Sequence, residues 1–162
     1  MANSLSGTVT PIRTATNTAL APIKTGHDPV TIVITPDGKT AYVANNGSGT
    51  VTPIRTASNT ALAPIKVGPH PDAIAITPDG GTVYVASDVS AGTVTPIRTA
   101  TNTALRPIRT GNPNDIAITP NGKTAYVTNF INGTVTPIRT ATNAALPSIK
   151  TGRNAVTIVI SP

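Results

Sequence analysis

Residues 49–55 read Gly-Thr-Val-Thr-Pro-Ile-Arg, and the same seven residues recur at 7–13, 92–98 and 133–139. Successive copies begin 42, 43 and 41 residues apart. A regular period of this length is typical of repeat proteins, in which each repeat folds into one small group of strands or helices. The chain of 162 residues is therefore predicted to contain about four copies of one structural unit.

One unit contains four β-strand signals separated by turn residues. Residues 31–35 form a β-branched run, and the turn Pro-Asp-Gly-Lys at 36–39 ends it because Pro presets φ and Gly tolerates positive φ. Further strands are expected at 40–45, 50–56 and 61–66. No segment shows an apolar period of 3.6 over the length of a helix. The sequence thus predicts an all-β fold.

Four short strands in about 42 residues are the content of one β-propeller blade. We predict a partial blade at 1–24, blades at 25–66, 67–109 and 110–150, and a final innermost strand at 151–162. Each copy of the recurring stretch carries a proline inside the third strand. Proline lacks the N–H that a strand ladder needs, so we expect a bulge or a missing ladder bond there.

The composition limits how such blades can be stabilised. The chain has no Cys, Trp, Glu or Gln, and its aromatic residues are three Tyr and one Phe. Many small contacts between Val, Ile and Ala must therefore replace disulfides and a large aromatic core. The net charge of +6 favours anionic partners without specifying one. No apolar stretch is long enough to span a membrane, and the N-terminus does not resemble a signal peptide.

The second-strand signals resemble the YVTN family of β-propeller repeats. The literal string stands at 126–129, with YVAN at 42–45 and YVAS at 84–87, and each follows a turn of the Pro-Asp/Asn-Gly type. The resemblance covers essentially the whole chain and implies a secreted or cell-surface propeller of unassigned activity. An acidic residue usually follows the third-strand Ile in that family. Here the position holds Arg, so no acid-dependent role is carried over.

The phase of the repeat predicts how the chain assembles. It opens on a third strand and ends on an innermost strand, as expected for an excerpt of a longer array. An open stack of blades leaves two apolar faces uncovered. Our leading hypothesis is a homodimer that closes an eight-bladed ring, with residues 155–160 of one copy meeting residues 8–24 of the other. A four-bladed monomer and an open head-to-tail filament are the alternatives.

The loops at one end of the blades vary among the copies, whereas the turns at the other end barely change. The variable loops enter the innermost strands or join second to third strands, including residues 88–91, and all are expected on one face. Function in repeat folds usually lies on such a face. The alternative is drift in exposed loops. The candidate binding residues are His27, Asp28, His70, Asp72, Asp88, Asn112, Asn114, Phe130, Asn132 and Arg153.

Two sets of basic residues recur once per repeat. They are Arg13, Arg55, Arg98 and Arg139, and Lys24, Lys66, Arg109 and Lys150. In a closed ring they would form circles of positive charge, suited to an anionic glycan or polymer. Nucleic acid is disfavoured because aromatic side chains for base stacking are nearly absent. The alternative is a solvated rim that keeps the protein soluble.

Residue patterns for specific catalytic chemistry are scarce. His27 and His70 match no zinc spacing, and the scattered Asp residues do not suggest a paired-carboxylate glycosidase. Asp37 and Asp79 are expected to be turn formers, since Asn121 replaces them in the third copy. We therefore predict no catalytic residue, metal or cofactor, and a non-enzymatic scaffold that binds protein or glycan partners at a cell surface. The alternatives are a propeller enzyme or redox protein similar to lactonases, or a fragment without a separate function.

Overall fold

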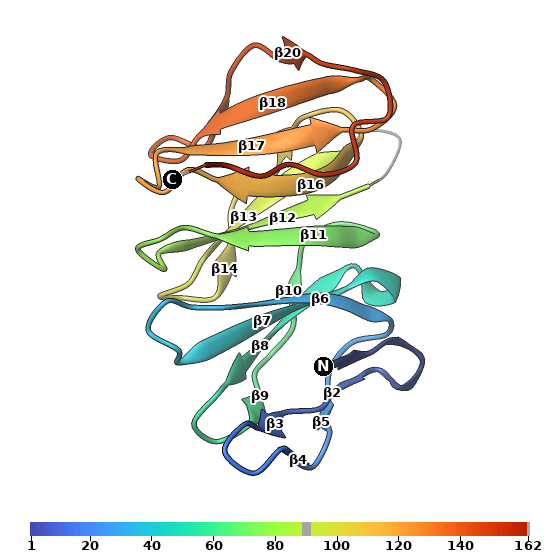
Figure 1. Ribbon diagram of the computed structural model, residues 1–162, viewed down its shortest axis with the longest axis vertical. Helices are drawn as coiled ribbons and strands as arrows, with labels where there is room; N and C mark the ends of the chain where they lie inside the picture. The colour runs from blue at the N-terminus through green and yellow to red at the C-terminus, as the bar shows by residue number, and fades with distance from the viewer. Residues whose placement is uncertain (89–91, 162) are drawn as a thin grey trace.

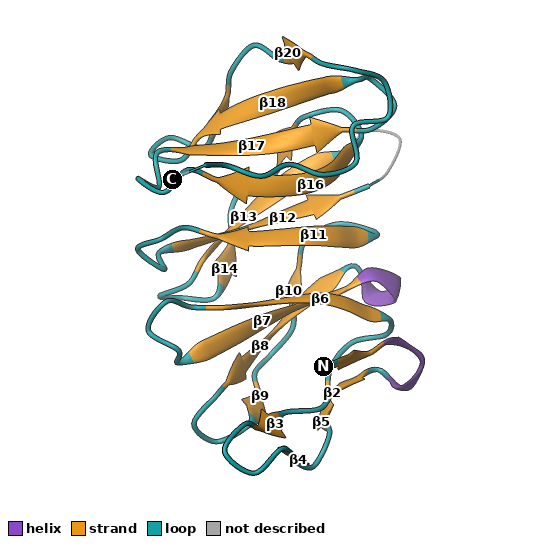
Figure 2. Ribbon diagram, in the orientation of Figure 1, coloured by secondary structure: helices purple, strands orange, loops and turns teal. Residues whose placement is uncertain are grey.

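The computed structural model describes residues 1–88 and 92–161, and it confirms the all-β prediction. Apart from two single-turn 3₁₀ segments, the regular structure of the described residues is antiparallel strand (Figure 2). The sheets follow one another in chain order along the long axis of the molecule (Figure 1). The predicted loop at 88–91 falls outside the described residues except for Asp88.

Each complete blade has three long strands and a fourth that is split in two. Blade 2 comprises β6 (Pro29–Ile34), β7 (Thr40–Asn45), β8 (Thr50–Arg55), β9 (Thr60–Ala61) and β10 (Ile65–Lys66). Blade 3 comprises β11 (Pro71–Ile76), β12 (Thr82–Ser87), β13 (Thr93–Arg98), β14 (Thr103–Ala104) and β15 (Ile108–Arg109). Blade 4 comprises β16 (Pro113–Ile118), β17 (Thr124–Asn129), β18 (Thr134–Arg139), β19 (Ala144–Ala145) and β20 (Ile149–Lys150).

Blade 1 is partial. It comprises β1 (Ala2–Asn3), η1 (Ser4–Ser6), β2 (Thr8–Val9), β3 (Ile12–Arg13), β4 (Thr18–Ala19) and β5 (Ile23–Lys24). A second 3₁₀ turn, η2 (Asn46–Ser48), joins β7 to β8 in blade 2. The innermost strand and most of the second strand that the other blades contain have no counterpart in blade 1.

The proline of the third strand explains why the fourth strand is split. Pro53 faces Tyr42 across β7 and β8, but its carbonyl accepts a hydrogen bond from the Leu62 N–H at 2.8 Å on the opposite side. Because the N–H and C=O of a strand residue point to the same side, the missing donor faces the fourth strand, which breaks there into β9 and β10. Leu20, Leu105 and Leu146 make the same bond to their prolines.

Of the two irregularities expected at this proline, the structure shows the missing ladder bond and no bulge. The β7–β8 register is continuous through Pro53. Register shifts occur instead in the innermost strands, between Pro29 and Thr31 and at the equivalent positions of blades 3 and 4. The expected bulge is therefore wrong for the third strand, because the proline's missing donor faces away from the second strand.

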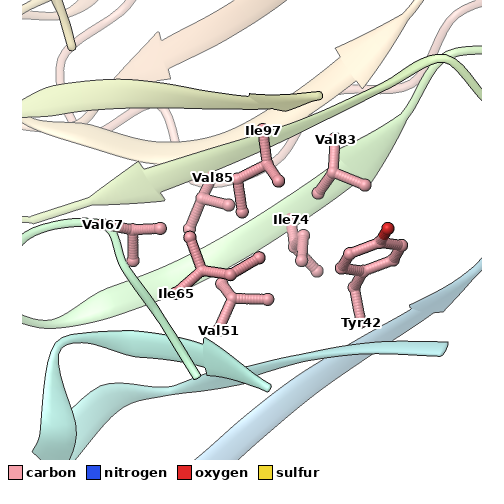
Figure 3. Packing of buried hydrophobic residues seen from close by; sticks show 8 residues of the cluster. All are labelled: Tyr42, Val51, Ile65, Val67, Ile74, Val83, Val85 and Ile97. Carbon is pink, nitrogen blue, oxygen red and sulfur yellow. The ribbon is translucent and has the colours of Figure 1, made fainter. Parts of the chain in front are cut away.

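The cores lie between blades rather than within them. Figure 3 shows the cluster between blades 2 and 3, where Tyr42, Val51 and Ile65 meet Ile74 and Val83. Equivalent clusters fill the junctions of blades 1 and 2 and of blades 3 and 4. Burial of such apolar area drives folding, and it is distributed here over many small side chains, as the composition predicts.

Each junction between complete blades also contains one tyrosine–asparagine hydrogen bond. The Tyr42 hydroxyl donates to Asn102 Oδ1 at 2.7 Å, and the Tyr84 hydroxyl donates to Asn143 Oδ1 at 2.6 Å. Burial raises the pKa of Tyr42 and raises that of Tyr84 to about 12, so both remain donors at neutral pH. The acceptor asparagines adopt positive φ, which Asn tolerates better than most residues.

Candidate functional site on the loop face

The loops that enter the innermost strands and those that join second to third strands lie on the same end of the blades, here called the loop face. Backbone hydrogen bonds connect the two sets within each blade. The Asn46 N–H donates to the Asp28 carbonyl at 2.8 Å, and the Asp88 N–H donates to the His70 carbonyl at 3.0 Å. The Phe130 N–H donates to the Asn112 carbonyl at 2.9 Å.

Asn46 connects blade 2 to the polar side chains that begin blade 3. Its amide nitrogen donates to Asp72 Oδ1, and its amide oxygen lies 3.1 Å from His70 Nδ1. An amide oxygen only accepts, so the imidazole donates at Nδ1 and leaves Nε2 free to exchange a proton elsewhere. His70 and Asp72, which were predicted as binding residues, therefore share one hydrogen-bond partner. That partner is Asn46, which was not predicted.

Electrostatics distinguish Asp72 from the turn carboxyls. Partial desolvation raises its pKa above the ordinary 3.8, and the charges of Asp88 and Asp28 raise it further. The hydrogen bond from Asn46 and the charge of His70 act in the opposite direction. Asp72 is exposed at the surface, and its partial desolvation together with the like charges nearby is a recognised sign of a functional site.

A cleft adjoins these residues. It is lined by residues 46–49, Lys66, Gly68, Pro69 and His70, between η2 and the connection from β10 to β11. The walls approach closely because Gly49 has a φ of +64, and a Cβ there would lie 2.8 Å from the Gly68 carbonyl oxygen. Lys66 therefore places a cation in the same cleft as His70.

The other predicted loop residues are distributed over the same face. Asp28 accepts a hydrogen bond from Ser4 of blade 1, and the His27 N–H donates to Ser48 Oγ at 2.6 Å. Asn114 donates to the Val156 carbonyl at 2.5 Å. Phe130, Asn132 and Arg153 are exposed. None of these side chains hydrogen-bonds to His70 or Asp72 among the described residues.

Asp115 is a loop-face residue that the sequence analysis missed. Its Oδ2 accepts from the Thr157 hydroxyl at 2.7 Å and from the Ile158 N–H at 3.0 Å. These bonds hold the C-terminal segment beside β16, as Figure 1 shows. No sequence signal could have found this role, because the other copies have Thr31, Ala73 and Thr157 at the equivalent position.

The structure separates the two basic rows. The arginines at the ends of the third strands pair with residues that follow the Pro-Asp-Gly turns, at the end called the turn face. The row of Lys24, Lys66, Arg109 and Lys150 pairs with the starts of the third strands, at the loop-face end. All eight side chains are exposed. Only the second row therefore lies near the loop-face cleft.

Asp37 and Asp79 on the turn face act within their own turns. The Thr35 hydroxyl donates to Asp37 and lowers its pKa, and the Thr77 hydroxyl does the same for Asp79. Asn121 accepts the equivalent bond from Thr119 at 2.7 Å. An uncharged side chain thus fulfils the same role in blade 4.

Two further features of the described residues concern metal ligands and membrane-spanning helices. No group of three His or Asp side chains there is placed to hold a metal ion. None of the helices in that part of the chain is long and apolar enough to cross a membrane.

Comparison with known proteins supports the architecture. No protein-family model and no curated protein sequence matches the chain. Among solved structures, hydrazine synthase from Kuenenia stuttgartiensis is similar with a TM-score of 0.83 and 29% identity, over 90% of this chain and 44% of that one. A candidate 6-phosphogluconolactonase from Bacteroides fragilis NCTC 9343 is similar with a TM-score of 0.73 and 26% identity, over 85% and 42%. The chain has a β-propeller fold.

The propeller neighbours correct one sequence-based prediction. Both carry the names of enzymes, and this contradicts the prediction that the chain is not an enzyme. That prediction rested on the absence of a contiguous motif. Propeller loops bring side chains together from separate strands and blades, as they bring Asn46 to His70 and Asp72 here, so a propeller site need not show a contiguous motif. The chain spans less than half the length of either neighbour.

Proposed function

We propose that the chain forms part of a β-propeller hydrolase that opens a sugar lactone at the loop face. The observation that carries this proposal is the Asn46 side chain, which donates to Asp72 and lies 3.1 Å from His70 Nδ1 at the edge of the cleft; the raised pKa of Asp72 supports it. The printed name of the Bacteroides neighbour supplies the substrate class. Lactone hydrolysis needs a base for water and a proton donor for the leaving oxygen, and these two side chains provide both.

The reaction assigns one role to each residue. The Asp72 carboxylate takes a proton from water while the water oxygen attacks the lactone carbonyl carbon. The ring C–O bond then breaks, and the ring oxygen takes a proton from the His70 side chain to give the hydroxy acid. A general base works best when its pKa lies near the operating pH, so the upward shift favours Asp72 in this role. Asn46 orients both side chains.

Lys66 favours a substrate that carries a negative group. Lys66 lines the cleft together with His70. A phosphate or carboxylate on the sugar would gain a charge-assisted hydrogen bond from Lys66 and would fix the lactone ring in the cleft. We therefore propose a phosphorylated sugar lactone as the substrate class.

We also propose that the repeats are of the YVTN type and that the protein acts outside the cell or at its surface. The strings at 42–45, 84–87 and 126–129 support this classification. They occupy β7, β12 and β17, the second strands of the three complete blades. A secreted location follows from the resemblance and is tested by fractionating the native host.

A second copy of the chain is our proposal for completing the ring. Ile12 of blade 1 is 50% exposed, whereas its equivalents Ile54, Ile97 and Ile138 are at most 3% exposed. Ile149 of blade 4 is also 50% exposed, against 8–9% for Ile23, Ile65 and Ile108. These two residues lie on opposite ends of the stack, and each belongs to a surface that every internal junction covers.

The test of the proposed hydrolase is proton release from 6-phosphogluconolactone and from gluconolactone. The chain should open the phosphorylated lactone faster than buffer alone, and Asp72→Asn should lower the rate by about 100-fold or more. Lys66→Ala should raise KM for the phosphorylated lactone and leave that for gluconolactone nearly unchanged.

Asp37→Asn is the matched control, because Asn121 already occupies the equivalent turn in blade 4. It changes a carboxyl of the turn face and should leave the rate unaltered. A wild-type rate equal to that of buffer, or equal rates for the wild type and Asp72→Asn, would overturn the proposal.

A further inference from the structure

The fourth strand of blade 3 departs from the repeat at two positions, and both changes are to arginine. Residues 105–109 read Leu-Arg-Pro-Ile-Arg, whereas the equivalent residues 20–24 and 62–66 read Leu-Ala-Pro-Ile-Lys. Blade 4 has Leu-Pro-Ser-Ile-Lys at 146–150. Blade 3 therefore carries two guanidinium groups, Arg106 and Arg109, where each other blade carries one ammonium group.

Both arginines line one groove at the junction of blades 3 and 4, here called the rim groove. Its volume is about 710 Å³, and its walls are residues 105–109 of blade 3 and residues 142–144 of blade 4. The strands β14 and β15 pair only with β13, so they form the outer edge of their sheet and the groove lies on the rim of the stack. A volume of this size is typical of small-molecule sites, which span about 300–1,000 Å³.

The polar side chains of the rim groove offer donors to an anion. Arg106 and Arg109 are exposed, and neither forms an ion pair, because the one ion pair among the described residues joins Lys39 to Asp37. No carboxylate is found among the described residues that line the groove. Two unpaired cations thus share a groove in which no negative group competes for them.

A third donor in the rim groove is held in place by the junction itself. The buried Tyr84 hydroxyl donates to Asn143 Oδ1 at 2.6 Å, and Asn143 has a φ of 54°. Because the oxygen and nitrogen of a carboxamide lie on opposite sides of Cγ, this bond also fixes the direction of Nδ2. Among the described residues that nitrogen donates no hydrogen bond. The lining thus combines two mobile cations with one fixed amide donor.

We infer that the rim groove is a binding site for a phosphate group that carries two negative charges. The planar fork of arginine donates two parallel hydrogen bonds to phosphate oxygens, which the ammonium of lysine cannot do. Two guanidinium groups balance the charge, and Asn143 Nδ2 supplies a further donor. Leu105 and Pro107 would contact the organic part of a phosphate ester.

The rim groove shares no residue with the loop-face cleft, so the inference does not depend on the proposed hydrolase. The phosphate could come from a phosphate monoester or from inorganic phosphate, and the experiments separate these two sources. Their readout is binding rather than lactone opening.

The first experiment titrates the full chain with phenyl phosphate and with phenyl sulfate, followed by NMR. The shifts should centre on Leu105, Ile108 and Ala144. A phosphate monoester gains its second charge near about pH 6, so phenyl phosphate should bind about tenfold more tightly at about pH 7.5 than at about pH 5. Phenyl sulfate keeps one charge and should show no such change. No Asp or His lines the groove among the described residues, so the ligand alone titrates in this range.

Arg106→Ala gives blade 3 the residue found at positions 21 and 63, so the fold should be retained. It should weaken the binding of phenyl phosphate about tenfold, through the loss of charge-assisted hydrogen bonds. Lys123→Ala is the matched control, because it removes one exposed cation that does not line the groove, at a position where blade 3 has Gly81. Circular dichroism checks both variants for native structure.

The source of the phosphate is tested by comparing phenyl phosphate with inorganic phosphate at about pH 7.5. Tighter binding of phenyl phosphate would identify an ester as the ligand, and equal affinity would identify the free ion. Three results would overturn the inference: binding that is unchanged in Arg106→Ala, binding that Lys123→Ala weakens equally, or binding of phenyl sulfate as tight as that of phenyl phosphate.

Discussion

At the scale of single residues, the charges of Asp72 and Asp37 have opposite effects on the stability of the fold. Asp72 holds its charge in a partly desolvated position near Asp28 and Asp88, which raises its pKa. Asp37 holds its charge against a threonine hydroxyl and the Lys39 N–H, which lower its pKa. A raised carboxyl pKa means that the charged form destabilises the fold, and a lowered one means that it stabilises the fold.

The two carboxyls are therefore expected to affect stability with opposite signs. The penalty at Asp72 is fully present above its folded pKa and disappears as the pH falls below the ordinary 3.8. Asp72→Asn should raise the Tm at pH 7 and leave it unchanged at about pH 3. The contribution of Asp37 is present above 3.8 and is lost as the pH falls through its lower folded pKa. Thermal melts across this range, with Asp37→Asn alongside, measure both; equal shifts at both pH values would contradict the assignment.

The tyrosine–asparagine bonds give a second prediction at this scale. Tyr84→Phe leaves the Asn143 oxygen without its donor in a buried junction, so it should lower the free energy of unfolding by about 1–2 kcal/mol. Tyr126→Phe removes a hydroxyl that has no hydrogen bond among the described residues and should change stability by less than about 0.5 kcal/mol. Denaturant unfolding of the two variants gives the comparison. Equal losses would show that the bond contributes nothing specific.

At the scale of elements, the connection from the second to the third strand depends on one glycine. Gly49 has positive φ, and a Cβ there would lie 2.8 Å from the Gly68 carbonyl oxygen. Gly49→Ala should therefore destabilise the chain by about 1–3 kcal/mol. Gly152→Ala is the control, because a Cβ there meets nothing within 4 Å. Chemical denaturation distinguishes them, and a neutral Gly49→Ala would show that the loop adjusts freely.

The strands and their order followed from the repeat because β-branched runs and Pro-Asp-Gly turns act locally. The long strands β6, β7 and β8 agree with the expected 31–35, 40–45 and 50–56 within two residues. The splitting of the fourth strand was not predicted. It depends on which way the missing N–H of Pro53 points, and that direction is set by pairing register rather than by local preference. The bulge after Pro29 has the same kind of cause.

The candidate site was less accessible to sequence reasoning than the fold. His70 and Asp72 were found because loops vary among the copies. Asn46 was not, although it binds both, since it comes from the preceding blade. The bonds from Tyr42 to Asn102 and from Tyr84 to Asn143 join residues 60 and 59 positions apart. Such partners are fixed only when one blade packs on the next, which no local pattern encodes.

At the scale of the whole molecule, the proposed second copy can be tested by mass. Light scattering coupled to gel filtration should give twice the 16.4 kDa of the chain. Ile149→Asp or Ile12→Asp places a charge on a surface that the closed ring would bury, and either should yield the single-chain mass. Leu5→Asp is the control, because Leu5 is fully exposed in η1 and its charge should leave the mass doubled. A wild-type chain of single mass would contradict ring closure by a second copy.

The tyrosine–asparagine bonds give the stack of blades a direction, because each runs from the tyrosine of one blade to the asparagine of the next. Blade 2 donates to blade 3 and blade 3 donates to blade 4, so Tyr126 of blade 4 and Asn59 of blade 2 are the equivalent donor and acceptor without a bond of this kind among the described residues. Inserting one more copy of the 42-residue unit would add one tyrosine donor and one asparagine acceptor, and it would leave both ends of the stack unchanged. Gene duplication can therefore change the number of blades without altering the contacts between them. The number of blades at which a ring closes is then set by the angle at which neighbouring blades pack.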